Sequence, residues 1–227
     1  MAVNQIIRIV IRWAIVMFVL AEGLVLVAGR TNLWTLNAYI VVLAPSLLAM
    51  MLAIAPQIMR ENRKAEESSK SDAAIRLALL GLFVLTLVVT TLDVGRLHLS
   101  SPVPVPLSVF GLVAFVAASG LQSWAMSVNS FYSPVIYVQA ERGHRVVSRG
   151  PYRMLRHPAY FANIVAVPAS ALAIGSWLGL IPAAACSALT IWRARKEDSF
   201  LQQHLAGYRE YMQEVRGGVW PRVSLKL

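Results

Sequence analysis

The chain has 227 residues, of which 57% are hydrophobic and 14% are charged, with 21 Lys and Arg against 11 Asp and Glu. Soluble domains have about a quarter of their residues charged, so this balance favours lipid as the main solvent. A formal net charge of +10 is typical of nucleic-acid binding or of an anionic membrane face, and the hydropathy favours the membrane. The single cysteine excludes an internal disulfide and a cysteine zinc site.

Apolar runs along the chain predict an all-α, polytopic transmembrane bundle of about six spans. A helix needs ~20 residues to cross the hydrocarbon core of a bilayer. The first four runs meet or approach that length, whereas the last two are shorter and only Gly175 and Ser176 separate them. The last two runs therefore predict a short helical hairpin. In chain order the runs cover residues 9–28, 36–58, 75–92, 103–125, 160–174 and 177–192.

Arginine and lysine are distributed unevenly between the two sides of these spans. Only Arg30 and Arg96 lie in the loops of one side, and the other 19 of the 21 lie on the opposite side. Because cytoplasmic loops are enriched in Lys and Arg, this asymmetry predicts an integral membrane protein with both termini in the cytoplasm. The membrane would be the plasma or inner membrane in a prokaryote and the endoplasmic reticulum in a eukaryote.

Two polar regions flank the predicted hairpin, and both are basic and rich in aromatic residues: 127–158 and 193–227. They divide the chain into N-terminal transmembrane helices, 1–125, and a functional core with the terminal hairpin and a cytoplasmic tail, 126–227. The stretch Glu61–Asp72 is polar and mixed in charge, which favours a solvated connecting loop. Glu22 lies inside the first span, where a carboxylate indicates a function or a partner in the bundle, and its role stays open.

Common nucleotide and metal motifs are not found in the sequence. No G-x-G-x-x-G follows a strand pattern, and no phosphate loop of the G-x-x-x-x-G-K-[ST] type is present. The four histidines have no paired metal spacing, so we expect no metal site. With the hydropathy favouring the membrane, the expected partners are membrane lipids and a lipophilic substrate, with no nucleic acid.

Four ordered elements in the second half carry the most specific signal: H-R-V-V at 144–147, G-P-Y-R-M-L-R-H-P-A-Y at 150–160, R-A-R-K-E-D at 193–198 and G-Y-R-E-Y at 207–211. This order resembles the isoprenylcysteine carboxyl methyltransferases and the related phospholipid N-methyltransferases. Their pattern reads H-x-L-V, G-P-Y-R-x-x-R-H-P-x-Y, an apolar hairpin, R-x-x-x-E-E and a tyrosine-bearing tail. Val146 and Asp198 depart from it, and Tyr208 follows its glycine directly. The likeness covers roughly residues 124–221.

The resemblance implies an S-adenosylmethionine-dependent methyltransferase that acts on a lipophilic acceptor, with an isoprenylcysteine-type carboxylate as the acceptor most like the family. Such a cofactor needs an aromatic slot, hydrogen-bonding partners for its ribose and paired opposite charges. Arg156 and His157 suit its carboxylate, and Glu197 suits its ammonium or ribose. The expected cofactor-binding residues are His144, Val147, Gly150, Tyr152, Arg156, His157, Tyr160 and Glu197.

Arg193 and Glu197 are the expected catalytic residues. They stand four positions apart, so on a helix leaving the membrane they share a face. Methyl transfer is an in-line displacement that needs alignment more than covalent help. Arg193 would position a carboxylate acceptor, whereas an amine acceptor would need a carboxylate or water to take its proton. A prenylcysteine carboxylate, a phospholipid amine and a small thiol or phenol all remain open.

Two other classes of function compete with this interpretation. Sterol reductases have a C-terminal region of similar pattern that binds NADPH, although they are considerably longer than this chain. A non-catalytic membrane scaffold or a small transporter is the second alternative. Transporters tend to place ionisable residues at mid-membrane in several helices, and here only Glu22 is clearly so placed.

Overall fold

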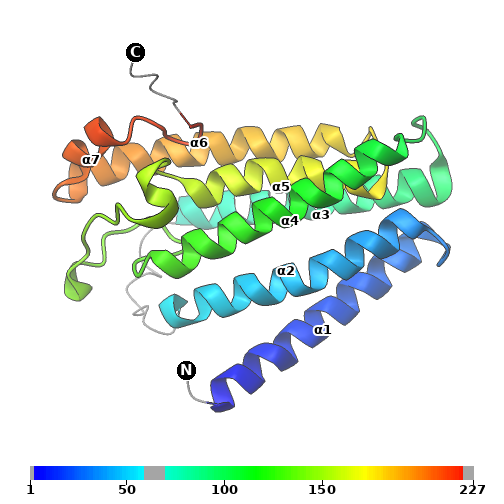
Figure 1. Ribbon diagram of the computed structural model, residues 1–227, viewed down its shortest axis with the longest axis horizontal. Helices are drawn as coiled ribbons and strands as arrows, with labels where there is room; N and C mark the ends of the chain where they lie inside the picture. The colour runs from blue at the N-terminus through cyan, green and yellow to red at the C-terminus, as the bar shows by residue number, and fades with distance from the viewer. Residues whose placement is uncertain (1–2, 59–69, 222–227) are drawn as a thin grey trace.

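The computed structural model describes residues 3–58 and 70–221, which form seven α-helices and no strand (Figure 1). Some of the predicted cytoplasmic charge, at Arg60, Arg63, Lys64, Arg222 and Lys226, lies outside these described residues. The helices are α1 (Val3–Ala28), α2 (Trp34–Ile58), α3 (Lys70–Leu92), α4 (Val105–Val128), α5 (Pro158–Ile174), α6 (Leu180–His204) and α7 (Tyr208–Glu214).

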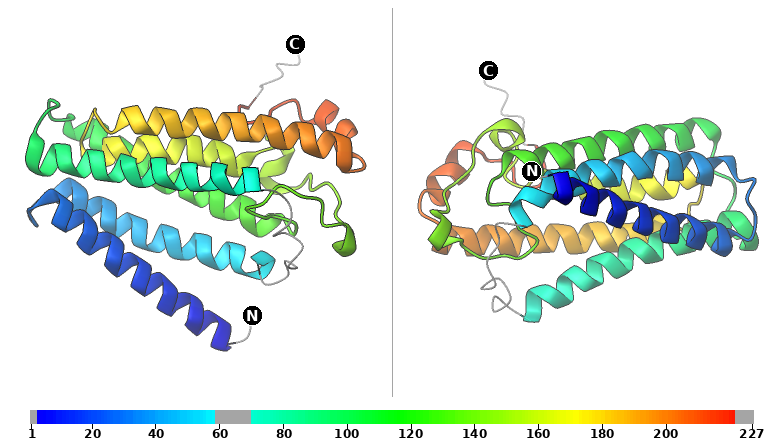
Figure 2. Two further views of the ribbon diagram at one scale, coloured as in Figure 1. Left: turned by 180° about the vertical axis from the view of Figure 1, so that it is seen from behind. Right: turned by 90° about the horizontal axis from the view of Figure 1, so that it is seen from below.

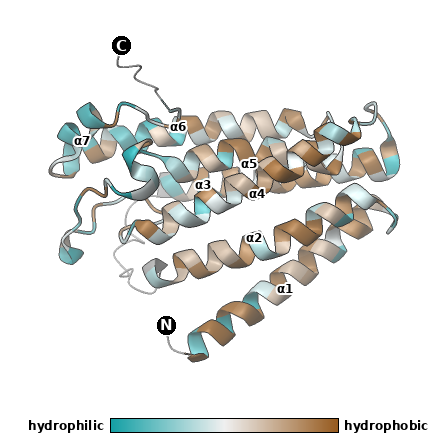
Figure 3. Ribbon diagram, in the orientation of Figure 1, coloured by the Kyte–Doolittle hydropathy of each residue, from teal (hydrophilic) through white to brown (hydrophobic). Residues whose placement is uncertain are grey.

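Within the described residues, four segments are long and apolar enough to cross a membrane: Val3–Ala28, Trp34–Pro56, Asp72–Leu97 and Val105–Val128. A helix satisfies its own backbone hydrogen bonds, which lipid cannot do, so apolar runs of this length fold as helices. Figure 3 shows the apolar residues along these helices and the hydrophilic ones gathered around α7 and the end of α6. The predicted polytopic helical bundle is confirmed.

The terminal hairpin is present, but its second arm is longer than expected. α5 is a short apolar helix of 17 residues, whereas α6 has 25 residues. The apolar part of α6 ends at Trp192, yet the helix continues to His204 with a charged sequence. The helix thus leaves the apolar zone without a break and carries Arg193 and Glu197 with it.

α5 occupies the centre of the bundle and contacts α2, α3, α4 and α6. It is rich in alanine, and most of its residues are buried. Small residues permit close helix packing in lipid, where no hydrophobic force drives helices together. On the facing side of α4, a Cβ added to Gly111 would lie 2.6 Å from the backbone nitrogen of Ala173. This glycine therefore sets the close approach of α4 and α5.

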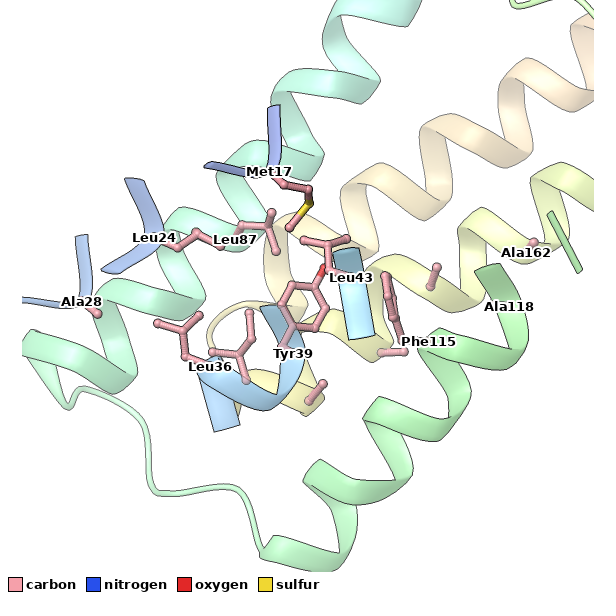
Figure 4. Close-up of a cluster of buried hydrophobic side chains, with 14 residues drawn as sticks. Met17, Leu24, Ala28, Leu36, Tyr39, Leu43, Leu87, Phe115, Ala118 and Ala162 are labelled. Carbon is pink, nitrogen blue, oxygen red and sulfur yellow. The ribbon is translucent and has the colours of Figure 1, made fainter. Parts of the chain in front are cut away.

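The largest apolar core joins the N-terminal helices to α5 (Figure 4). Tyr39 of α2 is fully buried, and its ring centroid lies 5.1 Å from that of Phe115 on α4. Its hydroxyl donates to Ser170 Oγ of α5 at 3.0 Å. Figures 1 and 2 show α1 diverging from the other helices toward its N-terminal end, which lies at the same end of the bundle as α7.

At the opposite end of the bundle, a buried carboxylate holds two loops together. Asp93 begins a π-helical turn, Asp93–Leu97, after α3. Its carboxylate accepts from the backbone N–H groups of Leu99 at 2.9 Å and Ser100 at 3.0 Å. The hydroxyls of Ser100 and Ser176 both donate to Asp93 Oδ2 at 2.5 Å. This Asp93 cluster ties the α3–α4 connection to the turn between α5 and α6.

Candidate cofactor site

A polar pocket lies at the α7 end of the bundle, where the segment after α4, the start of α5, the charged half of α6 and α7 converge. The sequence elements around 144–160 and 193–197 are thus brought together. Expected site residues that line this pocket are His144, Val147, Tyr152, Arg156, His157, Tyr160, Arg193 and Glu197.

Gly150 lies beside the pocket and is not part of its lining. Its φ of +58° is in the left-handed region that favours glycine. A Cβ added there would lie 3.2 Å from Cγ2 of Val128 at the end of α4. The structure therefore assigns this glycine to a turn packed against α4, two positions before Tyr152.

Arg156 and His157 both contact Asp198, the residue after Glu197. Arg156 donates to Asp198 through Nε at 3.2 Å and Nη2 at 2.8 Å, and His157 Nε2 lies 2.8 Å from Asp198 Oδ1. The hydroxyl of Tyr208 donates to the same oxygen at 2.7 Å. These four residues form the Asp198 cluster. The sequence assigned Arg156 and His157 to the cofactor carboxylate, whereas the structure gives them a carboxylate from the chain itself.

The Asp198 cluster also holds the C-terminal segment in place. Nη1 of Arg156 donates to the carbonyl of Val215 at 2.8 Å, and the backbone N–H of Arg156 donates to the carbonyl of Gly217 at 2.9 Å. Burial alone would raise the pKa of Asp198, but hydrogen bonds from His157 and Arg156 outweigh it and hold the pKa well below 3.8. Asp198 is therefore an anion at neutral pH.

Glu197 faces a wall of tyrosines. The hydroxyl of Tyr160 donates to Glu197 Oε2 at 2.7 Å, and the Tyr160 ring stacks on His157 with centroids 5.5 Å apart. Tyr132 also lines the pocket, and burial, followed by the charge of Glu197, raises its pKa to about 12. A carboxylate among neutral aromatic rings is suited to a cation, because both the charge and the ring faces attract one.

Arg193 is buried and has a partner that the sequence analysis did not identify. Its Nε and Nη2 lie 3.3 and 3.1 Å from Oδ1 of Asp72, and Nη2 also donates to the carbonyl of Pro134 at 2.5 Å. The expectation that Glu61–Asp72 is a solvated loop is wrong at its end, because α3 begins at Lys70, and residues 61–69 lie outside the described residues. Asp72 lies in the first turn of α3 and is only 3% exposed.

His144 gives the pocket a flat, neutral surface. Its ring stacks on Phe131 with centroids 4.6 Å apart, and Nδ1 accepts from the backbone N–H of Gln139 at 3.2 Å. Burial lowers the pKa of His144 to about 4, and the charge of Arg142 contributes. At neutral pH the imidazole is therefore uncharged, as stacking against an apolar or aromatic ligand group requires.

Residues 107–207 match the model of the phospholipid methyltransferase family. The matched stretch, 101 of the 227 residues, is similar to that family. It contains nearly all of α4, the whole of α5 and α6 and the pocket residues between them, and it leaves α1 to α3 outside. The predicted resemblance is confirmed, and the family description supports a membrane methyltransferase. No curated protein matches the chain.

Several residues that line or support the polar pocket are not among the site residues expected from the sequence. Tyr211 belongs to the fourth sequence element but not to the expected site residues, yet it is buried, lines the pocket and donates to the carbonyl of Tyr152 at 2.7 Å. Tyr132 belongs to none of the four sequence elements. Asp198 stands in the R-x-x-x-E-E element, so its motif position was a usable signal.

A second, apolar cavity of about 820 Å³ lies among α1 to α5. Its walls are aliphatic and aromatic, with Gln122 and Asn163 among the few polar residues. Asn163 donates to Thr190 Oγ1 on α6 at 3.1 Å and stands one helical turn after Tyr160 on α5. The cavity thus extends from the apolar core toward α6, the helix that also lines the polar pocket.

Proposed function

We propose that the protein is an S-adenosylmethionine-dependent methyltransferase that modifies a lipophilic acceptor at the cytoplasmic membrane face. The observation that carries this proposal is the convergence of the 144–160 and 193–197 elements on one pocket at the polar end of the bundle. The family match supports methyl transfer in a membrane setting. The position of the start of α1 and of α7 at this same end supports cytoplasmic termini.

The pocket residues fit the chemical parts of the cofactor, which supplies an electrophilic methyl group on a sulfonium ion. Glu197 is the carboxylate for its ammonium or ribose, and the rings of Tyr132 and Tyr160 are compatible with the sulfonium cation. His144 supplies a flat, neutral face suited to adenine. Arg145 lines the pocket and is exposed, so it suits the cofactor carboxylate once Arg156 and His157 are occupied by Asp198.

The acceptor in this proposal carries a lipid tail that occupies the apolar cavity among α1 to α5. Burial of an apolar chain in an apolar cavity places its polar end near Asn163 and Tyr160. An isoprenylcysteine-type carboxylate is the proposed acceptor group, because Arg193 is a cation that lines the pocket and is suited to align an oxygen anion for in-line attack.

Cofactor binding is tested by isothermal titration of S-adenosylhomocysteine into the protein purified in detergent. We expect binding by the unmodified protein and a loss of about tenfold to 100-fold in affinity for Glu197→Gln, which removes a charge and keeps the shape. Glu210→Gln, an exposed position on α7, is the matched control and should bind like the unmodified protein. Binding of NADPH without binding of S-adenosylhomocysteine would overturn the proposal in favour of a reductase.

The acceptor is tested by incubating the protein with methyl-labelled cofactor and separate pools of prenylcysteine and of ethanolamine phospholipid. A carboxyl methyl ester releases labelled methanol in base, whereas an N-methyl group does not. We expect base-labile label in the prenylcysteine pool. Base-stable label in the phospholipid pool would replace the carboxylate with an amine acceptor, and label in neither pool would overturn both assignments.

A further inference from the structure

Asp72 connects the N-terminal half of the chain to the methyltransferase pocket. It lies in α3, outside the region that matches the family model, and its carboxylate accepts from Arg193 through both oxygens, at 3.1 Å for Oδ1 and 3.2 Å for Oδ2 from Nη2. Arg76, one turn later, donates to Oδ2 at 3.1 Å from a partly exposed position. α3 packs along α6, so the contact joins two helices and not two loops.

The guanidinium of Arg193 is fixed on several sides. Asp72 accepts hydrogen bonds from Nε and Nη2 of Arg193, and the Pro134 carbonyl also accepts from Nη2. Cζ of Arg193 lies 5.6 Å from the ring centroid of Tyr160. Tyr160 in turn donates to Glu197. Asp72 does not line the pocket, whereas Arg193, Tyr160 and Glu197 do. A series of direct contacts therefore connects α3 to the pocket wall.

A buried ion pair is weak evidence for a purely stabilising role. Desolvation of two charges offsets most of their attraction, and an apolar pair of the same size packs as well in most proteins. The contacts between Asp72 and Arg193 are better explained if Asp72 orients the guanidinium of Arg193. A bidentate contact restricts a guanidinium far more than a single hydrogen bond does.

We propose that Asp72 is a positioning residue: it fixes the orientation of Arg193 beside Tyr160, so that α3 sets the geometry in which the acceptor meets the methyl group. This inference rests on the proposed methyl transfer and deepens it. It also gives a role to a helix that lies outside the matched methyltransferase region. Misplacement of an aligning group by about 1 Å costs on the order of 100-fold in rate.

The test measures methyl transfer and cofactor affinity separately in Asp72→Asn, Asp72→Glu, Arg193→Gln and the double variant Asp72→Asn/Arg193→Gln. Asp72→Asn should lower kcat/KM for the acceptor by about 100-fold, with the dissociation constant for S-adenosylhomocysteine within about threefold of that of the unmodified protein. In the double variant, Asp72→Asn should add almost nothing to the loss from Arg193→Gln, since Asp72 acts through Arg193. Arg76→Gln is the matched control on the same carboxylate and should keep methyl transfer within about threefold.

Asp72→Glu separates orientation from charge, because it keeps the ion pair and shifts the carboxylate by one methylene. For Asp72→Glu we expect a fall in kcat with an unchanged melting temperature. This test holds even if Asp72→Asn does not fold. Wild-type kcat in Asp72→Glu, or additive losses in the double variant, would overturn the positioning role while the cofactor titration still supports methyl transfer. Absence of cofactor binding in the unmodified protein would instead remove the proposed function itself.

Discussion

Each end of the bundle contains an aspartate held by several donors, Asp93 almost fully buried and Asp198 with 17% of its side chain exposed, and the two are satisfied in different ways. Asp93 accepts hydrogen bonds from two serine hydroxyls and from backbone N–H groups, which are neutral donors. Asp198 is bound by the guanidinium of Arg156, by His157 and by Tyr208. Asp93 lines neither of the two cavities described above, whereas the partners of Asp198 line the polar one.

This difference separates the tasks of the two ends. Neutral donors suffice to fix a turn, and they leave no charge exposed if the turn moves. A cationic donor such as Arg156 makes stronger hydrogen bonds, and the Asp198 cluster also leaves charged and aromatic surface facing the pocket. We therefore expect substitutions in the Asp93 cluster to affect the stability of the fold alone, and those in the Asp198 cluster to affect both stability and cofactor binding.

The largest effect is expected for Asp198→Ala, which leaves Arg156 and His157 without their carboxylate. Removing one partner of a largely buried ion pair costs about 3 kcal/mol or more, and release of the C-terminal segment opens the pocket. Both the melting temperature in detergent and the affinity for S-adenosylhomocysteine should fall. An affinity equal to that of the unmodified protein would show that the Asp198 cluster is structural only, like its counterpart at the other end.

Asp93→Ala should destabilise the fold by about 2 kcal/mol, because several buried donors lose their acceptor. The variant should bind S-adenosylhomocysteine with unchanged affinity at a temperature at which it remains folded. Unfolding followed by heat or by denaturing detergent, with titration on the same sample, measures both quantities. A clear loss of affinity would break the separation between the two ends.

Tyr39→Phe tests the join between α2 and α5, which lies nearer to the Asp93 cluster than to the Asp198 cluster. The change removes one buried hydrogen bond, to Ser170, and leaves the ring contact with Phe115. We expect a loss of about 1 kcal/mol in the free energy of unfolding and no change in cofactor affinity. Combining the substitution with Ser170→Ala should cost little more than Tyr39→Phe alone.

His144 gives the smallest predicted effect, and the effect depends on pH. Its pKa is lowered to about 4 in the folded protein, so between about pH 6.5 and pH 4 the unfolded chain binds more protons than the folded one. The stability contributed by neutral His144 is therefore present above pH 6.5 and is lost as the pH falls. The melting temperature should drop less between pH 7.5 and pH 5 in His144→Gln than in the unmodified protein.

The sequence predicted the helical bundle and most of the pocket wall, because both depend on local or ordered signals. Apolar runs determine where helices cross lipid. The motif order around the hairpin predicted that His157 and Glu197 lie at one pocket, although they are 40 residues apart in the chain. The motifs did not indicate which carboxylate binds which basic side chain. In the structure Arg156 and His157 bind Asp198, and Arg193 binds Asp72.

Asp72 escaped notice because it ends a polar stretch whose composition is typical of a solvated loop, and because 121 positions separate it from Arg193. A physical signal was nevertheless present. Arg193 follows directly on an apolar run, so a cation there needs a carboxylate from another helix at the same membrane face. Asp72 stands directly before the third apolar run, which the distribution of Arg and Lys places at that face.

The shortness of α5 sets the depth of the polar pocket in the bundle. Its 17 residues span about 26 Å at 1.5 Å each, less than the roughly 30 Å of a bilayer's hydrocarbon layer. Its neighbours cover it on several sides, so its first turn, with Tyr160, is recessed relative to the far end of α6. On the proposed function, a methyl donor seated at this depth meets its acceptor in place, and no step that extracts a whole lipid from its leaflet is required.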